Sequence, residues 1–170
     1  MHSTRLSVVS AVSLLARVSL AAVWLASGVI KAASPTDTVV AVRAYRLLPE
    51  SLVVPTASAL PFLEIGLGLL LLIGLGTRVA AAASAAFLLL LIGVIASVWA
   101  RGMSIDCGCF GGGGAADVSS WDYIAELARD TGFLALAVWL VRFPRSPLSM
   151  GLRSRSLTLR PASQDAVSHA

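Results

Sequence analysis

Residues 79–100 read VAAAASAAFLLLLIGVIASVWA, a stretch without a charged side chain. A helix needs about 20 mainly apolar residues to cross the hydrocarbon core of a bilayer, which is about 30 Å thick. The stretch meets that length, and it lacks the alternation of polar and apolar residues that marks the strands of an outer-membrane β-barrel. It therefore predicts a transmembrane α-helix.

Three other stretches have the same character, at about residues 14–33, 52–75 and 123–143. Hydrophobic residues make up 57% of the chain and charged residues 13%, which is more apolar than a soluble domain of 170 residues needs for its core. Inside a bilayer only helices and closed barrels satisfy the backbone. We therefore predict an all-α integral membrane protein, a bundle of four transmembrane helices over residues 14–143 that follows a short N-terminal segment, residues 1–13.

The positive charges predict how this bundle is oriented, because Lys and Arg near helix ends favour the cytoplasmic side. Most lie before or near the start of the first helix, in the turn after the second helix, and beyond the fourth: Arg5, Arg17, Arg78, Arg142, Arg145, Arg153, Arg155 and Arg160. Fewer lie on the other side: Lys31, Arg43, Arg46 and Arg101. We expect both termini in the cytoplasm and the loop at residues 101–121 on the outer face of an inner (plasma) membrane.

The two ends of the chain carry weaker signals. Arg5, an apolar run and Ala32-Ala33-Ser34 loosely resemble a cleavable secretory signal, but Lys31 lies where such a signal is uncharged, which favours an uncleaved first helix. Residues 144–170 contain helix-breaking prolines and are rich in Ser and Arg, so we predict a disordered basic cytoplasmic tail that touches anionic lipid. The net charge of +4 therefore gives no reason to expect nucleic acid binding.

Cys107 and Cys109 are the only cysteines of the chain, and they stand in the sequence DCGCFG at residues 106–111. The extracytoplasmic side of a membrane permits disulfides. One residue between two cysteines closes a small ring, and a strained, exposed disulfide is readily exchanged. Asp106 opposes this activation, since an adjacent negative charge raises the pKa of a thiol.

Three interpretations of the cysteine pair are therefore open: a redox-active pair, which we favour, a structural disulfide, and a metal-binding or inert pair of thiols. A structural zinc site takes four Cys or His ligands. This chain has two cysteines, and its two histidines, His2 and His169, stand at the chain ends. We accordingly predict no metal site.

Glu64 stands about midway along the second predicted helix, one turn beyond Pro61. A carboxylate at that depth is costly and usually faces the bundle interior. It could relay protons, bond a quinone or form an ion pair, or it could simply fix the helix packing. Lys31, at the outer end of the first helix, is a candidate partner for Glu64 or for an acid of the fourth helix.

The start of the fourth predicted helix carries a second polar group. Ser119 and Asp122 have the spacing of a capping box, and Glu126 can face Arg129 on the helix surface. Arg129 and Asp130 could organise the cysteine loop, or they could pair only locally.

Several short motifs together resemble the MauE branch of the DoxX-like membrane proteins, over about residues 17–143. These motifs are an arginine near the start of the first helix, Ser27-Gly28-Val29-Ile30-Lys31, Tyr45-Arg46-Leu47-Leu48-Pro49, Leu60-Pro61-Phe62-Leu63-Glu64, Arg101-Gly102, CGCFG at residues 107–111, and Arg129-Asp130. CGCFG in a polar loop before a fourth helix is the most specific of them.

The resemblance implies a four-helix, redox-associated membrane protein, linked to maturation, processing or transport of the disulfide-rich small subunit of methylamine dehydrogenase. On this basis Cys107 and Cys109 would exchange disulfides with an extracytoplasmic thioredoxin-like partner or client. Glu64, Lys31, Arg129 and Asp130 would support the loop or proton movement. Whether this makes the chain an enzyme, a thiol–disulfide oxidoreductase, is open.

A membrane scaffold or redox-complex subunit, with the cysteines only stapling a loop, is the alternative. A transporter has little support, since four helices show no visible repeat. No nucleotide-binding glycine motif or haem-attachment motif is present, so no cofactor is evident. A bound quinone is compatible with the site but has no support in the sequence.

Overall fold

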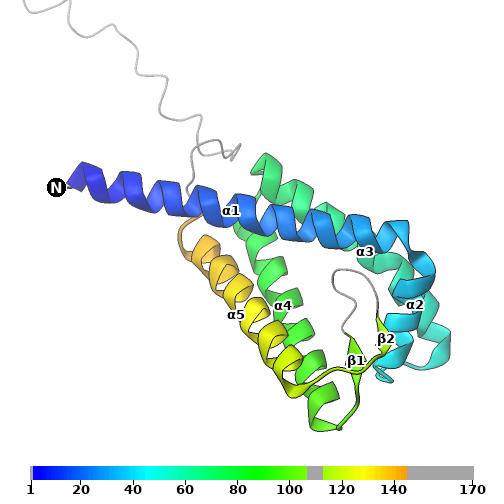
Figure 1. Cartoon of the computed structure of the whole chain (residues 1–170). Helices are drawn as coiled ribbons and strands as arrows, with labels where there is room; N and C mark the ends of the chain where they lie inside the picture. The colour runs from blue at the N-terminus through cyan, green and yellow to red at the C-terminus, as the bar shows by residue number, and fades with distance from the viewer. Residues whose placement is uncertain (1, 107–112, 145–170) are drawn as a thin grey trace, which may run out of the picture.

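The computed structural model describes residues 2–106 and 113–144. This part of the chain forms five helices and one two-stranded antiparallel sheet (Figure 1). The elements are α1 (His2–Ala33), α2 (Pro35–Ala44), α3 (Glu50–Ile73), α4 (Thr77–Ala100), β1 (Ile105–Asp106), β2 (Gly114–Ala115) and α5 (Ser120–Arg142). The predicted class, an all-α membrane protein, is confirmed.

Three helices within the described residues are long and apolar enough to cross a membrane: Val8–Ala33, Glu50–Ile73 and Thr77–Ala100. They correspond to the first three predicted spans, although α1 begins at His2 rather than near residue 14. The fourth predicted helix is present as α5. It is not among these three candidate membrane spans, because its first half carries the charged residues Glu126, Arg129 and Asp130.

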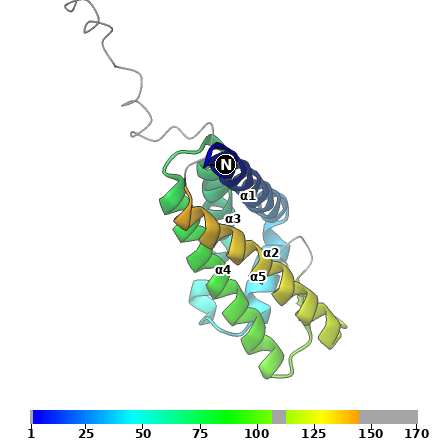
Figure 2. The same ribbon diagram turned by 90° about the vertical axis from the view of Figure 1, so that its left-hand side faces the viewer.

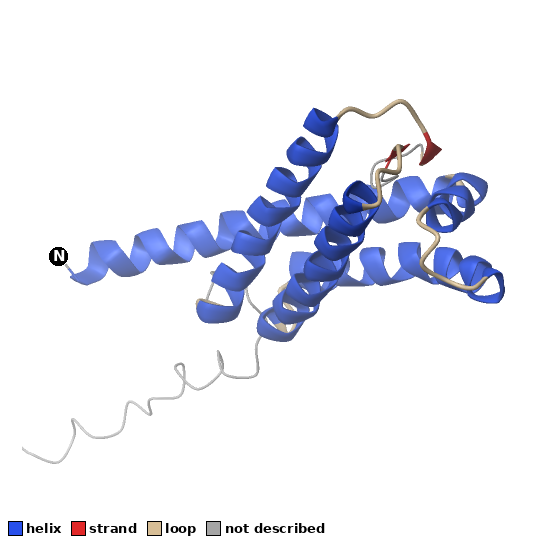
Figure 3. Cartoon of the chain, turned by 90° about the horizontal axis from the view of Figure 1, so that it is seen from below, coloured by secondary structure: helices blue, strands red, loops and turns tan. Residues whose placement is uncertain are grey.

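The helices pack as two pairs. α1 lies lengthwise against α3, and α4 lies lengthwise against α5. The α4/α5 pair crosses the α1/α3 pair at an angle (Figures 1 and 3). Figure 2, which looks from the side of the N-terminus, shows α4 and α5 side by side beneath the start of α1. Polar groups of helices from different pairs can therefore meet where the two pairs cross.

Two apolar cores lie at opposite ends of the molecule. One core joins α1, α3, α4 and α5 around residues such as Leu20, Leu71, Leu88 and Leu140. At this end Ser13 Oγ of α1 donates a hydrogen bond to the backbone oxygen of Phe143, which follows α5 (3.0 Å). The first half of α1 and the end of α5 are thus held together.

The tight turn between α3 and α4 is made possible by glycine. Gly74 and Gly76 both have positive φ, 76° and 58°, a conformation that glycine adopts without strain. The backbone N–H of Gly74 bonds back to the carbonyl oxygens of Leu70 and Leu71, which closes the last turn of α3. The chain can therefore reverse within three residues.

The second core lies at the opposite end, where Ile95 and Val98 of α4 meet Ile105 of β1 and Tyr123 of α5. Sequence analysis treated this region, residues 101–121, as one polar loop. The structure instead pairs β1 with β2 in the register Ile105 with Ala115 and Asp106 with Gly114. The two strands flank residues 107–112. Cys107 and Cys109 belong to this segment, which lies outside the described residues.

Helix α2 was not predicted. Pro35 begins it, in keeping with the preference for proline in the first turn of a helix, and Asp37 adds a favourable negative charge there. Its buried Val42 packs on Val53 and Ala57 of α3. The first loop is therefore a packed helix that borders the hairpin.

Candidate functional site

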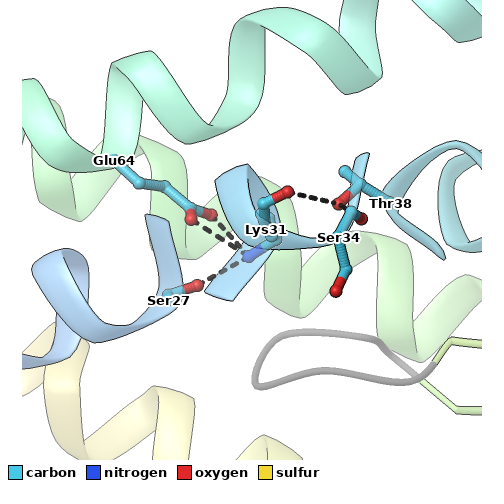
Figure 4. A network of polar contacts seen from close by, with 5 residues as sticks. All are labelled: Ser27, Lys31, Ser34, Thr38 and Glu64. Carbon is cyan, nitrogen blue, oxygen red and sulfur yellow. Dashed lines mark hydrogen bonds and ion pairs between the residues drawn. The ribbon is translucent and has the colours of Figure 1, made fainter. Parts of the chain in front are cut away.

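Lys31 and Glu64 form a buried ion pair between α1 and α3 (Figure 4). Lys31 Nζ lies 2.8 Å from Glu64 Oε1 and 3.0 Å from Oε2, and it also donates to Ser27 Oγ at 2.6 Å. The side chain of Glu64 is 2% exposed and that of Lys31 is 12% exposed. These three acceptors match the three N–H donors of an ammonium group, which compensates for removing the charges from water.

The predicted partnership of Lys31 with Glu64 is therefore confirmed in geometry. Ser27 was part of a quoted motif, but its contact with Lys31 was missed. The available signal was spacing, because residues four apart lie on one face of a helix. At the other side of Lys31, Thr38 Oγ1 of α2 lies 3.3 Å from the Lys31 carbonyl oxygen and 3.1 Å from that of Ser34. This contact ties α2 to the end of α1.

Two glycines allow α1 and α3 to approach closely enough for this pair. A Cβ atom placed on Gly28 would lie 2.7 Å from Ile65 Cγ1 and 3.0 Å from both the Ile65 nitrogen and the Pro61 carbonyl oxygen. On the facing helix, a Cβ on Gly68 would lie 2.7 Å from Leu25 Cγ. Small residues at helix contacts in membranes bring backbones together in this way.

We expect Gly28→Ala to lower the free energy of unfolding by about 1–3 kcal/mol, since the new methyl group overlaps backbone atoms that cannot move alone. Gly66→Ala, in the same contact region of the sequence but with nothing within 4 Å of its Cβ position, is the matched control and should leave stability unchanged or slightly raised. Thermal unfolding of both purified variants in the same detergent measures the difference. Equal stability of the two variants would show that the helix separation is not sterically fixed at Gly28.

Arg129 and Asp130 form a second ion pair, on α5. Arg129 Nε lies 3.0 Å from Asp130 Oδ1. The side chain of Asp130 is only 5% exposed, whereas that of Arg129 is 31% exposed. The second carboxylate oxygen, Oδ2, is buried and accepts no hydrogen bond within the part of the chain that the structure describes.

A small cavity joins the two ion pairs. It has a volume of about 20 Å³ and is lined by residues of α1, α3, α4 and α5: Val23, Trp24, Ser27, Glu64, Leu88, Leu91, Arg129, Asp130 and Phe133. Of the supporting residues predicted from the sequence, Glu64, Arg129 and Asp130 line it directly, and Lys31 reaches it through Glu64. The cavity has room for a water molecule but not for a quinone ring.

The ends of the cysteine-containing segment are anchored at the α2 end of the molecule. Tyr123 Oη of α5 accepts a hydrogen bond from the Ile105 N–H (3.0 Å) and donates one to the Met103 carbonyl oxygen (2.7 Å). Gly114 has φ of 105°, and a Cβ there would lie 3.0 Å from Val40 Cγ1 of α2. The hairpin is thus held between α2 and the first turn of α5.

One further sequence prediction concerns this region. The capping box is confirmed, because the Ser119 backbone N–H donates to Asp122 Oδ2 at 2.7 Å and the Ser119 side chain meets the Asp122 backbone N–H. The Ser119 hydroxyl also donates to Asp122 Oδ2 at 2.8 Å. The two bonds to Oδ2 hold the pKa of Asp122 below its usual range, with the backbone bond the larger cause. Arg101 Nη2 donates to the Tyr45 carbonyl oxygen (2.8 Å), which joins the end of α4 to the end of α2.

Comparison with known proteins gives one finding. The family model described as "Methylamine utilisation protein MauE" matches residues 9–143. This range includes every described helix except the first turns of α1. No curated protein and no solved structure matches the chain.

Proposed function

Because the chain belongs to the methylamine utilisation protein MauE family, we propose that it supports thiol–disulfide exchange on the outer face of the membrane. The substrate class is a disulfide-rich extracytoplasmic protein, of which the small subunit of methylamine dehydrogenase is the candidate from family membership. The main observation that supports this proposal is the β1/β2 hairpin. Its two strands flank a short segment that contains both cysteines of the chain, and they contact α2 and α5.

The proposed reaction is an exchange of two electrons. A thiolate of a thioredoxin-like partner or client attacks one sulfur of a Cys107–Cys109 disulfide, and the S–S bond breaks as a mixed disulfide forms. A second thiolate of the partner then attacks the mixed disulfide, which leaves the partner oxidised and Cys107 and Cys109 as a dithiol after uptake of two protons. The reverse sequence of the same steps oxidises the pair.

The proposal includes a fourth transmembrane helix, α5. At about 1.5 Å per residue, its 23 residues extend about 35 Å, enough to cross a bilayer core. Its central acid, Asp130, is buried against the other helices, which is how ionisable groups are normally placed in a membrane. Four crossings put both termini on one side, consistent with the Ser13–Phe143 hydrogen bond.

Charge at the two ends of the bundle supports the orientation. Arg78 begins α4 and Arg142 ends α5 at the end where the α3–α4 turn lies, and the basic segment after residue 144 continues from there. The opposite end carries fewer basic residues: Lys31, Arg43, Arg46 and Arg101. The positive-inside rule therefore favours a cytoplasmic position for the termini and an outer position for the hairpin.

A membrane-impermeant maleimide applied to intact cells tests both the side and the redox state of the pair. We expect Cys107 and Cys109 to be labelled from outside only after reduction, and to be reoxidised when a thioredoxin-like oxidant is added. The measurement is a gel shift of the labelled full-length protein. Thiols that are always reduced, or that label only after permeabilisation, would contradict the proposal.

Two reporter cysteines provide the controls, in a background with both native cysteines replaced by serine. Leu47→Cys lies at the hairpin end and Leu75→Cys lies in the α3–α4 turn, and both side chains are about half exposed. Leu47→Cys should label in intact cells, and Leu75→Cys should label only after permeabilisation. This comparison separates an error in orientation from an error in the redox assignment.

A scaffold role is the second candidate, and the buried Lys31–Glu64 pair favours it, since this pair fixes two helices without needing the cysteines. Under that role a variant without cysteines would still support assembly of the partner complex.

A further inference from the structure

The cavity between the two helix pairs is surrounded by ionisable groups that take no part in the proposed thiol exchange. Three ionisable side chains line it, Glu64, Arg129 and Asp130, and Lys31 is paired with Glu64. The formal charges of these four groups sum to zero. A site without net charge has no electrostatic reason to select a cation or an anion, and it favours a neutral ligand.

Asp130 identifies what the ligand must provide. Its Oδ1 accepts a hydrogen bond from Arg129 Nε, but its buried Oδ2 accepts none from the described residues. Leaving a buried acceptor unsatisfied costs about 1–3 kcal/mol, and more when the group is charged. Glu64 lines the same cavity, and each carboxylate oxygen has more than one lone pair to share. The ligand must therefore donate hydrogen bonds.

Size then limits the choice. The cavity volume of about 20 Å³ exceeds the roughly 10–15 Å³ that one water molecule requires. A water molecule has two O–H donors, one for each carboxylate, and its oxygen can accept a bond from the Ser27 hydroxyl or the Arg129 guanidinium. The remaining walls are apolar and include Trp24, Leu88 and Phe133.

From this geometry we infer that the cavity is a binding site for a single buried water molecule, which bridges Glu64 of α3 and Asp130 of α5. The water joins the α1/α3 pair to the α4/α5 pair by hydrogen bonds at the place where they cross. It also provides a path for proton exchange between two acids that belong to different helix pairs. This inference goes beyond the proposed function and does not depend on the cysteines.

Hydroxyl-radical footprinting of the full chain in membranes tests the site, because radicals formed from a bound water oxidise the buried side chains beside it. Trp24 is the probe, since it lines the cavity and is only 2% exposed. Tyr123 is the control, a reactive aromatic that is 5% exposed and does not line the cavity. We expect Trp24 to be oxidised several-fold faster than Tyr123. Equal or slower oxidation of Trp24 would overturn the inference.

Substitution of Asp130 gives an independent measure. Asp130→Leu removes the acceptor and fills the space, so oxidation of Trp24 should fall to the level of Tyr123. Asp130→Asn keeps an acceptor, so most of the Trp24 oxidation should remain in that variant. If Trp24 is oxidised equally fast in wild type and in a folded Asp130→Leu variant, the radicals do not come from this water. If Asp130→Leu does not fold, the comparison of Trp24 with Tyr123 in the wild type still decides.

Discussion

Glu64→Gln is expected to lower the free energy of unfolding by about 3–5 kcal/mol, because it leaves the Lys31 ammonium buried without its counter-charge. Gln keeps the size and one acceptor of Glu, so the loss reports the charge rather than a cavity. The measurement is thermal or denaturant unfolding of the purified protein in detergent, together with its abundance in membranes.

A double variant and the exposed Arg43–Glu50 ion pair provide the controls for this test. Lys31→Met combined with Glu64→Met removes both charges and should recover most of the stability that either single change loses. Arg43 and Glu50 form an ion pair in the same protein, with side chains that are 48% and 68% exposed, and Glu50→Gln should cost less than about 1 kcal/mol. Equal losses for Glu64→Gln and Glu50→Gln would show that burial of the Lys31–Glu64 pair has no energetic weight.

The same variant separates packing from proton transfer. If Glu64 only holds α1 against α3, then Glu64→Gln reduces the amount of folded protein and leaves the turnover per folded molecule unchanged. If Glu64 relays protons, turnover per folded molecule falls, and the double methionine variant does not recover it. Turnover here means the rate of disulfide exchange with a thioredoxin-like partner, normalised to folded protein.

Cys107→Ser with Cys109→Ser is expected to abolish disulfide exchange with the partner while leaving the abundance of the protein unchanged. The chain has no other cysteines, so no alternative pair can substitute. The fraction of client in disulfide form, measured by alkylation and gel shift in cells, should fall to the level of a strain that lacks the protein. Ser104→Ala, an exposed change beside β1, is the matched control and should have no effect.

Single cysteine variants sharpen this result. A mixed disulfide cannot be resolved by the chain's own second thiol when only one cysteine remains, so a covalent complex with the partner should accumulate in one or both single variants. Trapping would identify the partner directly. Client oxidation that continues in the double serine variant would instead support the scaffold role.

The spans of α3 and α4 were predictable from the sequence because one signal, a long run of apolar residues, decides them. The helices at residues 52–75 and 79–100 begin within two residues of the observed α3 and α4. The extension of α1 to His2 was not visible, since Arg5 and the serines near it lower the apolar content although they do not prevent a helix.

The first and third loops were harder for a different reason. Helix α2 gains its stability from Val42 packing on α3, and the hairpin gains its stability from Tyr123 and α2, so both depend on contacts between distant residues. Local sequence patterns do not report such contacts. The same limit applied to the site: a charge in an apolar helix pointed to Glu64, whereas the meeting of Asp130 with Glu64 at one cavity needed the crossing of the two helix pairs.

The placement of the two ion pairs has a consequence for biogenesis. Arg129 and Asp130 are neighbours on one helix, so their charges are already matched when α5 leaves the ribosome. Lys31 and Glu64 belong to helices that are made one after the other, and neither charge is matched until both helices have entered the bilayer. The Lys31–Glu64 contact can therefore form only after α3 has been made, and until then the end of α1 lacks this counter-charge.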